Sequence, residues 1–262
     1  MNITIFGGNQ PRHLALVRSL SVLFERVFFI SEIKTVATHD LDDQQKKSSM
    51  LAAYFSRVAC AENKIFGEID FLPDNVTTLA VKLGDLSNLN KNQLSKALNS
   101  DIYIVFGASY IKGWLIDFLI SRKALNVHMG LSPYYRGAGC NFWALYDQNP
   151  GFVGATIHRL NRGLDDGPML FHCLPKIKRA CDPFEFSMHS VLAAHNGLIA
   201  AIKNNSISDR TPVPQNKSLQ IRYSRHRDLS DTVANQFLEA SPLIEPSSII
   251  YPQLLNPYFS PI

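Results

Sequence analysis

The segment from residue 102 to residue 128 constrains the fold of this chain most. Ile102 to Phe106 (IYIVF) is apolar throughout, which is typical of a strand covered on both faces, as parallel strands are. Apolar residues then recur at helical spacing from Ile111 to Leu119, and Ala124 to His128 (ALNVH) has the pattern of another strand. A strand, a helix and a strand of this combined length form the crossover that parallel pairing requires.

Similar units precede this segment. We expect strands at 2–6, 26–30 and 79–83, and helices at 11–24, 41–61 and 88–98, with Asp42 and Asp43 near the start of the second helix. Repeated strand–helix units predict an α/β fold with a Rossmann-like, mostly parallel open sheet. The ligand site of such a sheet lies beyond the carboxyl ends of its strands.

The pattern changes after Gly151. Residues 152–160 and 169–174 predict an antiparallel hairpin at the edge of the sheet, and a helix follows at 183–202, with Asp182 as its N-cap and Glu185 completing a capping box. Half of the 14 prolines lie from Pro212 onward. We therefore expect a main domain at 1–205 and an irregular, proline-rich C-terminal extension at 206–262.

The composition argues against several classes of protein. Hydrophobic residues make up 46% of the chain, which excludes a disordered protein. No run of about 18 apolar residues lacks a charge, so we expect no membrane span. The four cysteines form no CxxC pair, which favours a reduced, cytoplasmic location and no metal site. The net charge of +4 is small and the basic residues are scattered, so we expect no nucleic-acid partner.

Two polar residues end the last strand of the crossover. Asn126 and His128 are two positions apart, so their side chains point to the same face of the strand, at its carboxyl end. An amide donor beside an imidazole can polarise a carbonyl group and move a proton. Taken alone, such a pair is more often a structural cap than a catalytic group.

Two loops follow that can contribute to the same site. Residues 130–139 contain three glycines, Pro133 and Arg136, and such a loop can bring backbone N–H groups and a guanidinium to a ligand. Leu164-Asp165-Asp166-Gly167 is by itself a turn. If this turn folds back over the strand end, one of its carboxylates would orient His128 and stabilise the charged imidazole.

The order and spacing of these residues form a pattern. It consists of Asn126-x-His128, Leu131-x-Pro133-x-Tyr135-Arg136-Gly137, Gly154-x-Thr156-x-His158 and Gly163-Leu164-Asp165-x-Gly167. The pattern resembles that of the formyltransferases that use 10-formyltetrahydrofolate. The resemblance implies the formyltransferase fold with a catalytic domain at 1–205, a triad of Asn126, His128 and Asp165, and 10-formyltetrahydrofolate as donor without a metal. Asp166 stands where an uncharged residue is usual, so its share in the role of Asp165 stays open.

The loop after His128 reads Gly-Leu-Ser-Pro-Tyr-Tyr-Arg-Gly and is most similar to that of the nucleotide-sugar N-formyltransferases. The resemblance thus implies that the acceptor is the amine of a nucleotide-linked amino sugar made for surface polysaccharide (O-antigen). The tail after Thr211 is short for the C-terminal barrel of methionyl-tRNA formyltransferases. Three alternatives stay open: an amine of the glycinamide ribonucleotide or methionyl-tRNA type, hydrolysis of the formyl donor, and a folate-binding module without turnover.

The same resemblance suggests where the two substrates bind. We expect the pterin of the donor beside a cofactor-binding set made of Phe106, Gly107, Ala108, Tyr110 and Leu164. The acceptor's phosphates are expected where the first strand leads into the first helix and in the loop after His128, at Asn9, Arg12, His13, Tyr135 and Arg136. The sequence does not decide the oligomeric state, and a homodimer is one option.

Overall fold

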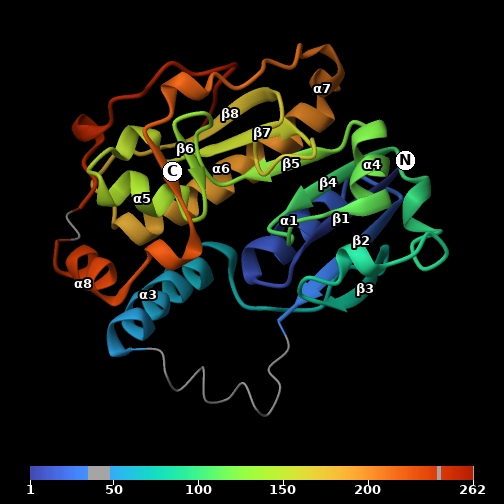
Figure 1. Cartoon of the computed structure of the whole chain (residues 1–262), viewed down its shortest axis with the longest axis horizontal. Coiled ribbons are helices and arrows are strands. Elements are labelled where there is room, and N and C mark those ends of the chain that lie inside the picture. Colours follow the sequence, from blue (N-terminus) through green and yellow to red (C-terminus); the bar gives the residue numbers. More distant parts are fainter. Residues whose placement is uncertain (35–47, 241–242, 262) are drawn as a thin grey trace.

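An eight-stranded sheet organises the chain in the computed structural model (Figure 1). The structure describes residues 1–34, 48–240 and 243–261. The strand order across the sheet is β10-β8-β7-β5-β4-β1-β2-β3. These strands are β1 (Asn2–Gly8), β2 (Arg26–Ile33), β3 (Val76–Lys82), β4 (Ile102–Phe106), β5 (Leu125–His128), β7 (Ala155–Arg159), β8 (Met169–Lys176) and β10 (Tyr258–Pro261).

The first half of the sheet is parallel, as the sequence predicts. β1 pairs with β2 on one side and β4 on the other, and β2–β3 and β4–β5 extend the parallel part. The central strands β1 and β4 are buried almost throughout because helices cover both faces. The strand order reverses at β1, and in open α/β sheets ligands bind at the carboxyl ends of the strands near such a reversal. The predicted fold class is confirmed.

The second half of the sheet is antiparallel. β7 pairs antiparallel with both β5 and β8, which confirms the predicted hairpin. Its predicted place at the sheet edge is wrong, because β10 from the C-terminal tail pairs in parallel with β8 and covers it. β8 is buried along seven of its eight residues, so its outer side needs this partner.

Helices cover both faces of the sheet. One face carries α1 (Pro11–Ser21), α3 (Ser49–Phe66) and α6 (Pro183–Lys203), which pack on one another over the larger hydrophobic core. The other face carries α4 (Gly113–Ser121) over a second core. Three further α-helices lie in the described residues: α5 (Cys140–Tyr146), α7 (Ser206–Asp209) and α8 (Asp231–Ala240). None of the helices in the described ranges is both long and apolar enough to cross a membrane.

Two predicted helices differ from the structure. The helix expected at 88–98 is wrong: only short 3-10 turns form there, at Leu86–Asn88 and Ala97–Asn99. The side chains of Asn90 and Gln93 accept each other's backbone N–H bonds (3.0 and 2.8 Å), which is the pattern of a capping box, but residues 91–96 that follow form only turns. The helix expected at 41–61 begins at Ser49, and the predicted start at Asp42 and Asp43 lies outside the described residues.

The start of α6 follows its predicted cap in part. The side chain of Asp182 accepts the backbone N–H groups of Phe184 and Glu185, as an N-cap does. The carboxylate of Glu185 instead contacts Lys64 of α3, at 2.5 Å. The ion pair thus joins two helices where the sequence predicts a bond within one cap.

The tail from residue 206 is interwoven with the main domain. Its strand β9 (Arg222–Ser224) pairs in parallel with β6 (Tyr135–Gly137), in the loop that follows His128, and β10 joins the main sheet. Figure 1 shows this orange and red segment lying along the yellow-green loops and strands. The tail therefore contacts the same loops that the sequence predicts around the ligand site.

Candidate active site

Three of the predicted site residues converge at the end of β5. Asn126 and His128 project to the same side of the strand and are both buried. Asp165 reaches them from the loop between β7 and β8: its Oδ1 accepts a hydrogen bond from Asn126 Nδ2 at 3.1 Å, and its Oδ2 lies 3.5 Å from His128 Nδ1. The loop thus folds back over the strand end, as the sequence analysis requires for a joint site.

The two neighbouring aspartates of this loop have different surroundings. Asp165 adopts a left-handed backbone conformation (φ 48°), which turns its side chain toward β5. The carboxylate of Asp166 instead lies 3.7 Å from the ammonium of Lys217, in the tail. The geometry therefore assigns the contact with Asn126 and His128 to Asp165 alone.

His158 completes the cluster, and the sequence analysis did not select it as a site residue. It lies directly opposite Asn126 in the β5–β7 register. Its Nδ1 is 2.8 Å from the carbonyl oxygen of Arg159, so Nδ1 carries the proton, and its Nε2 accepts a hydrogen bond from Asn126 Nδ2 at 3.0 Å. Burial lowers the pKa of His158 to about 4, which keeps the ring neutral. Its place in the Gly154-x-Thr156-x-His158 part of the sequence pattern is the signal that would have identified it.

These contacts orient the amide of Asn126. Its nitrogen donates to His158 on one side and to Asp165 on the other, so both amide hydrogens are engaged. His158 is nearly fully buried, whereas Asp165 is partly exposed. The bond to His158 therefore fixes which way the amide points, and the bond to Asp165 is the one that a ligand at the surface can replace.

The loop after His128 is held by β7 and α5. Thr156 Oγ1 donates to the carbonyl oxygen of Gly130 at 2.7 Å and accepts the N–H of Ser132 at 2.8 Å. At the start of α5, the thiol sulfur of Cys140 lies 3.6 Å from Nε2 of the His128 imidazole. Burial raises the pKa of Cys140, so this group is a neutral thiol.

A small pocket adjoins the cluster on the side of β4. Its volume is about 110 Å³, and its walls include Ala108, Tyr110 and Leu164 from the predicted donor-binding set, together with Asn126 and Asp165. Tyr110 and Leu164 are half exposed, so the pocket opens to solvent. The structure thus brings three predicted donor contacts to Asn126 and Asp165, whereas His128 does not line this pocket.

Phe106 and Gly107, the other two predicted donor contacts, do not line this pocket. Phe106 is buried, and its ring packs on that of His13 with 4.7 Å between centroids. Gly107 has φ 68°, and a Cβ atom there would lie 2.2 Å from His13 Nε2. Both residues face His13, so the structure gives them a supporting position behind the pocket wall.

The end of β1 carries the residues predicted for the acceptor's phosphates. Arg12 makes an ion pair with Glu62 of α3 at 2.8 Å, and its backbone N–H also donates to that carboxylate. Gln10 and His13 cap α1 reciprocally, with Pro11 as its first residue. Burial, and secondarily the charge of Arg12, lower the pKa of His13 well below its usual value, so it is neutral. Asn9 is half-buried beside them.

The two predicted acceptor contacts in the loop after His128 are also buried. The hydroxyl of Tyr135 accepts a bond from Asn149 at 2.8 Å and donates to Asp147 at 3.2 Å. The ring of Tyr135 is fully buried, which makes it part of the loop's own framework. Arg136 donates to Gln220 of the tail at 3.3 Å, and its Nε has no partner among the described residues.

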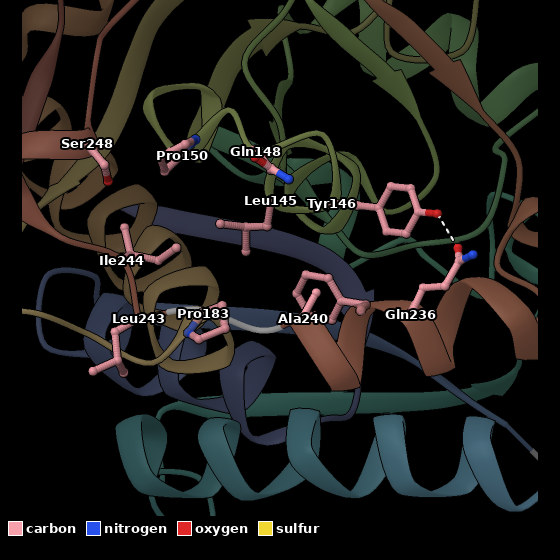
Figure 2. A pocket seen from close by; sticks show the side chains of 11 residues that line it. Leu145, Tyr146, Gln148, Pro150, Pro183, Gln236, Ala240, Leu243, Ile244 and Ser248 are labelled. Atoms are coloured by element: carbon pink, nitrogen blue, oxygen red, sulfur yellow. Dashed lines mark hydrogen bonds between the residues drawn. The ribbon is translucent and has the colours of Figure 1, made fainter.

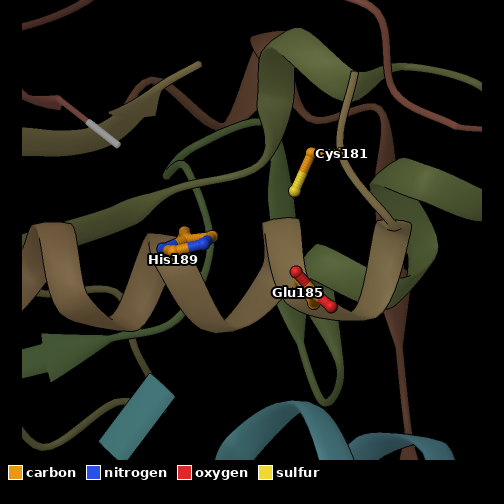
Figure 3. Close-up of side chains that lie close together, drawn as sticks. All are labelled: Cys181, Glu185 and His189. Carbon is orange, nitrogen blue, oxygen red and sulfur yellow. The ribbon is translucent and has the colours of Figure 1, made fainter. Parts of the chain in front are cut away.

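A cluster with metal-ligand chemistry lies elsewhere, at the start of α6. Figure 3 shows Cys181, Glu185 and His189, whose ligand atoms lie within 4.8 Å of one another. The ammonium of Lys64 already contacts the carboxylate of Glu185, and burial raises the pKa of Cys181 to about 11. The cluster thus holds a lysine cation and a protonated thiol, which are both unfavourable for a metal ion.

A larger apolar pocket of about 630 Å³ lies between α5, α8 and the segment after residue 242 (Figure 2). Its lining includes Leu145, Ile244 and Pro183, and Tyr146 bonds to Gln236 across its rim at 2.6 Å. None of the predicted site residues lines it. It has few polar groups and no convergent titratable residues, so it does not compete with the cluster at β5 as a catalytic site.

Comparisons with known proteins agree on one family. The model of the formyl transferase family matches residues 27–202. A methionyl-tRNA formyltransferase of Agathobacter rectalis is 29% identical over 138 residues, which are 52% of this chain and 43% of that protein. The chain thus spans less than half of that relative's length.

Two solved structures share the fold. A 4-N formyltransferase from Francisella tularensis matches with a TM-score of 0.55 and 13% identity, over 98% of this chain and 91% of that one. An N-formyltransferase from Helicobacter canadensis, in complex with folinic acid and dTDP-3-aminofucose, matches with a TM-score of 0.50 and 14% identity, over 90% and 78%. At such identities the likeness concerns the fold alone.

The matched region extends from β2 to the end of α6. It therefore contains β5 with Asn126 and His128, the loop with Asp165, and the pocket between them. The sequence pattern, the sheet topology and the family model all lead to the same result. The chain belongs to the formyl transferase family.

Proposed function

We propose that the protein is an N-formyltransferase that moves a formyl group from 10-formyltetrahydrofolate to the primary amine of a nucleotide-linked amino sugar. The observation that carries this proposal is the convergence of Asn126, His128 and Asp165 beside a pocket that opens to solvent. An amide, an imidazole and a carboxylate are the groups that an acyl transfer to an amine requires.

The donor is supported by the pocket next to the cluster. A pterin is a flat ring with many donors and acceptors, and the pocket walls bring the backbone at Ala108, Ser109 and Gly163 close to such a ring. The N–H groups of Ser109 and Gly163 already donate to Glu32 and Asn161, so their carbonyl oxygens are the groups available to it. The carboxylate of Glu32 holds this wall in place, because it accepts bonds from the backbone N–H and the hydroxyl of Ser109 at 2.6 and 2.7 Å. The Helicobacter canadensis neighbour was crystallised with a folate, folinic acid.

In the first step, the unprotonated amine attacks the formyl carbon, and the electron pair of the carbonyl π bond moves to the formyl oxygen. Asn126 donates a hydrogen bond to this oxygen in place of its bond to Asp165, while His158 keeps the amide in orientation. His128 is the second donor, through its Nδ1–H, which gives up its contact with Asp165 for this bond. Removal of one such donor typically lowers the rate by about 100- to 1,000-fold.

In the second step, the carbon–nitrogen bond to the folate breaks and tetrahydrofolate leaves. The attacking nitrogen must lose a proton, and the folate nitrogen must gain one. The negative charge of Asp165 first stabilises protonated His128. Asp165 then accepts the proton from the amine, directly or through water, and His128 gives its proton to the folate nitrogen. The carboxylate and the imidazole therefore carry the proton between the two nitrogens.

The acceptor is supported by the loop sequence and by the names of the structural neighbours. One of them was crystallised with a nucleotide-linked amino sugar, dTDP-3-aminofucose. We expect Arg136 rather than Arg12 to bind the diphosphate of such an acceptor. The Nε–H of Arg136 has no partner among the described residues, whereas Arg12 is paired with Glu62. We further propose that the formylated sugar is used in the synthesis of surface polysaccharide.

A second acceptor is favoured by one observation. Curated relatives whose sequences match this chain are methionyl-tRNA formyltransferases, such as that of Agathobacter rectalis at 29% identity. The chain spans only part of these relatives, so formylation of methionyl-tRNA is the alternative activity. The small net charge of +4 argues against a tRNA acceptor.

The test is a panel of acceptors incubated with 10-formyltetrahydrofolate. It contains nucleotide-linked amino sugars, glycinamide ribonucleotide and methionyl-tRNA, and mass spectrometry detects the gain of one formyl group. We expect formylation of at least one nucleotide-linked amino sugar and none without the donor. Formylation of methionyl-tRNA alone would establish the alternative, and binding of folate without any product would establish a module without turnover.

A further inference from the structure

The turn that carries Asp165 is held by the C-terminal tail. We infer that Gln215 is a positioning residue for Asp165, so that the tail completes the active site. This inference rests on the proposed function, since the role of Asp165 does. Gln215 was not among the residues that the sequence pattern singled out.

The turn needs support from outside because its own conformation is unfavourable. Asp165 has φ 48°, a left-handed conformation that is unfavourable for residues with a side chain. The residues from Asn161 to Pro168 form bends without helix or strand hydrogen bonds. A carboxylate on such a turn reaches Asn126 and His128 only while its surroundings keep the backbone in this shape.

Gln215 supplies two bonds to the turn. Its side-chain nitrogen donates to the carbonyl oxygen of Asp165 at 2.8 Å and to that of Gly167 at 3.0 Å. The two bonds link the backbone at Asp165 with the backbone two residues further on. They therefore fix the conformation in which the Asp165 side chain points to β5.

Gln215 is itself anchored to the sheet. Val213 and Met169 exchange two backbone hydrogen bonds, both of 2.8 Å, which attach the tail to the first residue of β8. Lys217 adds a contact of 3.7 Å to Asp166. The amide of Gln215 thus lies between two attachment points, and its position relative to the turn is determined by the main sheet.

The experiment combines kinetics with hydrogen exchange on the full chain. Three variants are made: Gln215→Ala, Gln215→Glu, which keeps the shape but removes the donors, and Gln253→Ala, which truncates an exposed glutamine of the same tail as a control. Gln215→Ala is also combined with Asp165→Asn. The kcat of formyl transfer and the exchange rates of the amides of residues 161–167 are measured for each.

We expect Gln215→Ala and Gln215→Glu to lower kcat by about 10-fold and to speed exchange in the turn, since two neutral hydrogen bonds are lost. Gln253→Ala should match the wild type in both measurements. In the Asp165→Asn background, Gln215→Ala should lower kcat by less than about 2-fold, because the group it positions is already inactive.

Two results would overturn the inference: a kcat close to that of the wild type with unchanged exchange, or a loss that is fully additive with Asp165→Asn. If one variant at position 215 does not fold, the other decides. If the wild type formylates no acceptor, the proposed function fails, and hydrogen exchange alone then decides whether Gln215 holds the turn.

Discussion

The carboxyl ends of β5 and β1 both carry polar side chains in positions typical of ligand contacts, and the structure uses them differently. At β5, Asn126 and His128 meet the carboxylate of Asp165 beside an open pocket. At β1, the guanidinium of Arg12 is paired with Glu62, and the ring of His13 is buried under Gly107. The residues at the end of β5 lie beside a pocket that a ligand can enter. Those at the end of β1 contact other side chains of the protein.

The difference shows what a polar residue at a strand end needs in order to act on a ligand. It must keep hydrogen-bonding capacity at a surface that a ligand can reach. Asp165 is partly exposed and its bond to Asn126 can be exchanged, whereas His13 is buried and accepts the N–H of Gln10 at 3.3 Å. The strand end alone does not distinguish the two cases, but the partners from other elements do.

The largest expected effect concerns the end of β5. His128→Ala and Asp165→Ala should each lower kcat by about 100- to 1,000-fold, because each removes a group that stabilises the charge formed in the transition state. Binding of the folate donor should stay within about 3-fold, since neither change removes the pocket walls at Ala108 and Tyr110. Steady-state kinetics and fluorescence titration with folate measure the two quantities.

His226→Ala, which truncates an exposed histidine of the tail, is the matched control and should leave kcat unchanged. Full activity in His128→Ala would contradict the assignment of the site to β5. Loss of activity in the control would point to a general sensitivity of the fold.

Acid should destabilise the loop after β5 through His172. Its Nε2–H donates to the carbonyl oxygen of Ser132 and its Nδ1 accepts the N–H of Leu255, both at 2.9 Å, so protonation would place two donors face to face. Burial lowers the pKa of His172 from 6.5 to about 4. Between these pH values the unfolded chain binds more protons, so the free energy of unfolding falls as the pH drops, by about 3 kcal/mol for this group.

Urea unfolding at about pH 7 and about pH 5 should show about 2 kcal/mol of this loss, because the lower pH still lies above the pKa of His172 in the folded protein. His172→Gln should be less stable than the wild type at the higher pH but should show a smaller dependence on pH. An unchanged pH dependence would mean that other buried histidines, such as His195 with a pKa lowered to about 3, dominate the acid response.

At the end of β1, Arg12→Ala should act on stability. It leaves the carboxylate of Glu62, which is 7% exposed, without its cation, and we expect the free energy of unfolding to fall by about 2 kcal/mol. Arg18→Ala on the same helix is the control and should change stability by less than about 0.5 kcal/mol. Chemical denaturation measures both.

The same variant tests the predicted phosphate contact. The KM for the acceptor should stay within about 3-fold if Arg12 serves only Glu62. A rise of about 10- to 150-fold, the value of a charge-assisted bond, would return Arg12 to the acceptor site and remove the contrast with β5.

The smallest expected effect concerns Cys140. Its thiol lies 3.4 Å from the carbonyl oxygen of Gly137, to which it donates, so the sulfur can accept the Nε2–H of His128. Cys140→Ala removes this weak acceptor and should lower kcat by about 3-fold, whereas Cys140→Ser should retain most of the activity. Cys60→Ala, at an exposed cysteine, is the control for the kinetic assay. Equal kcat values in all three variants would exclude a role for Cys140 in holding the ring.

Much of the fold follows from local sequence patterns. The apolar run of β4 and the spacing of α4 predict a buried parallel strand and its crossover helix, and the structure contains both. The helix expected at 88–98 does not form: residues 91–96 are turns, although Asn90 and Gln93 make the reciprocal bonds of a helix start, so local periodicity and capping do not decide this segment. The strand β10, with a proline at its end, forms only because β8 offers a free side for pairing.

The sequence by itself determined the parallel half of the sheet and the pairing of Asn126 with His128 on one face of β5, because side-chain direction along a strand depends on local geometry alone. The tertiary structure decided which groups join them. Asp165, His158 and Gln215 come from a turn, a neighbouring strand and the tail, and their distances to β5 depend on strand register and loop packing. It also paired Arg12 with Glu62, a contact across 50 residues that no local pattern contains.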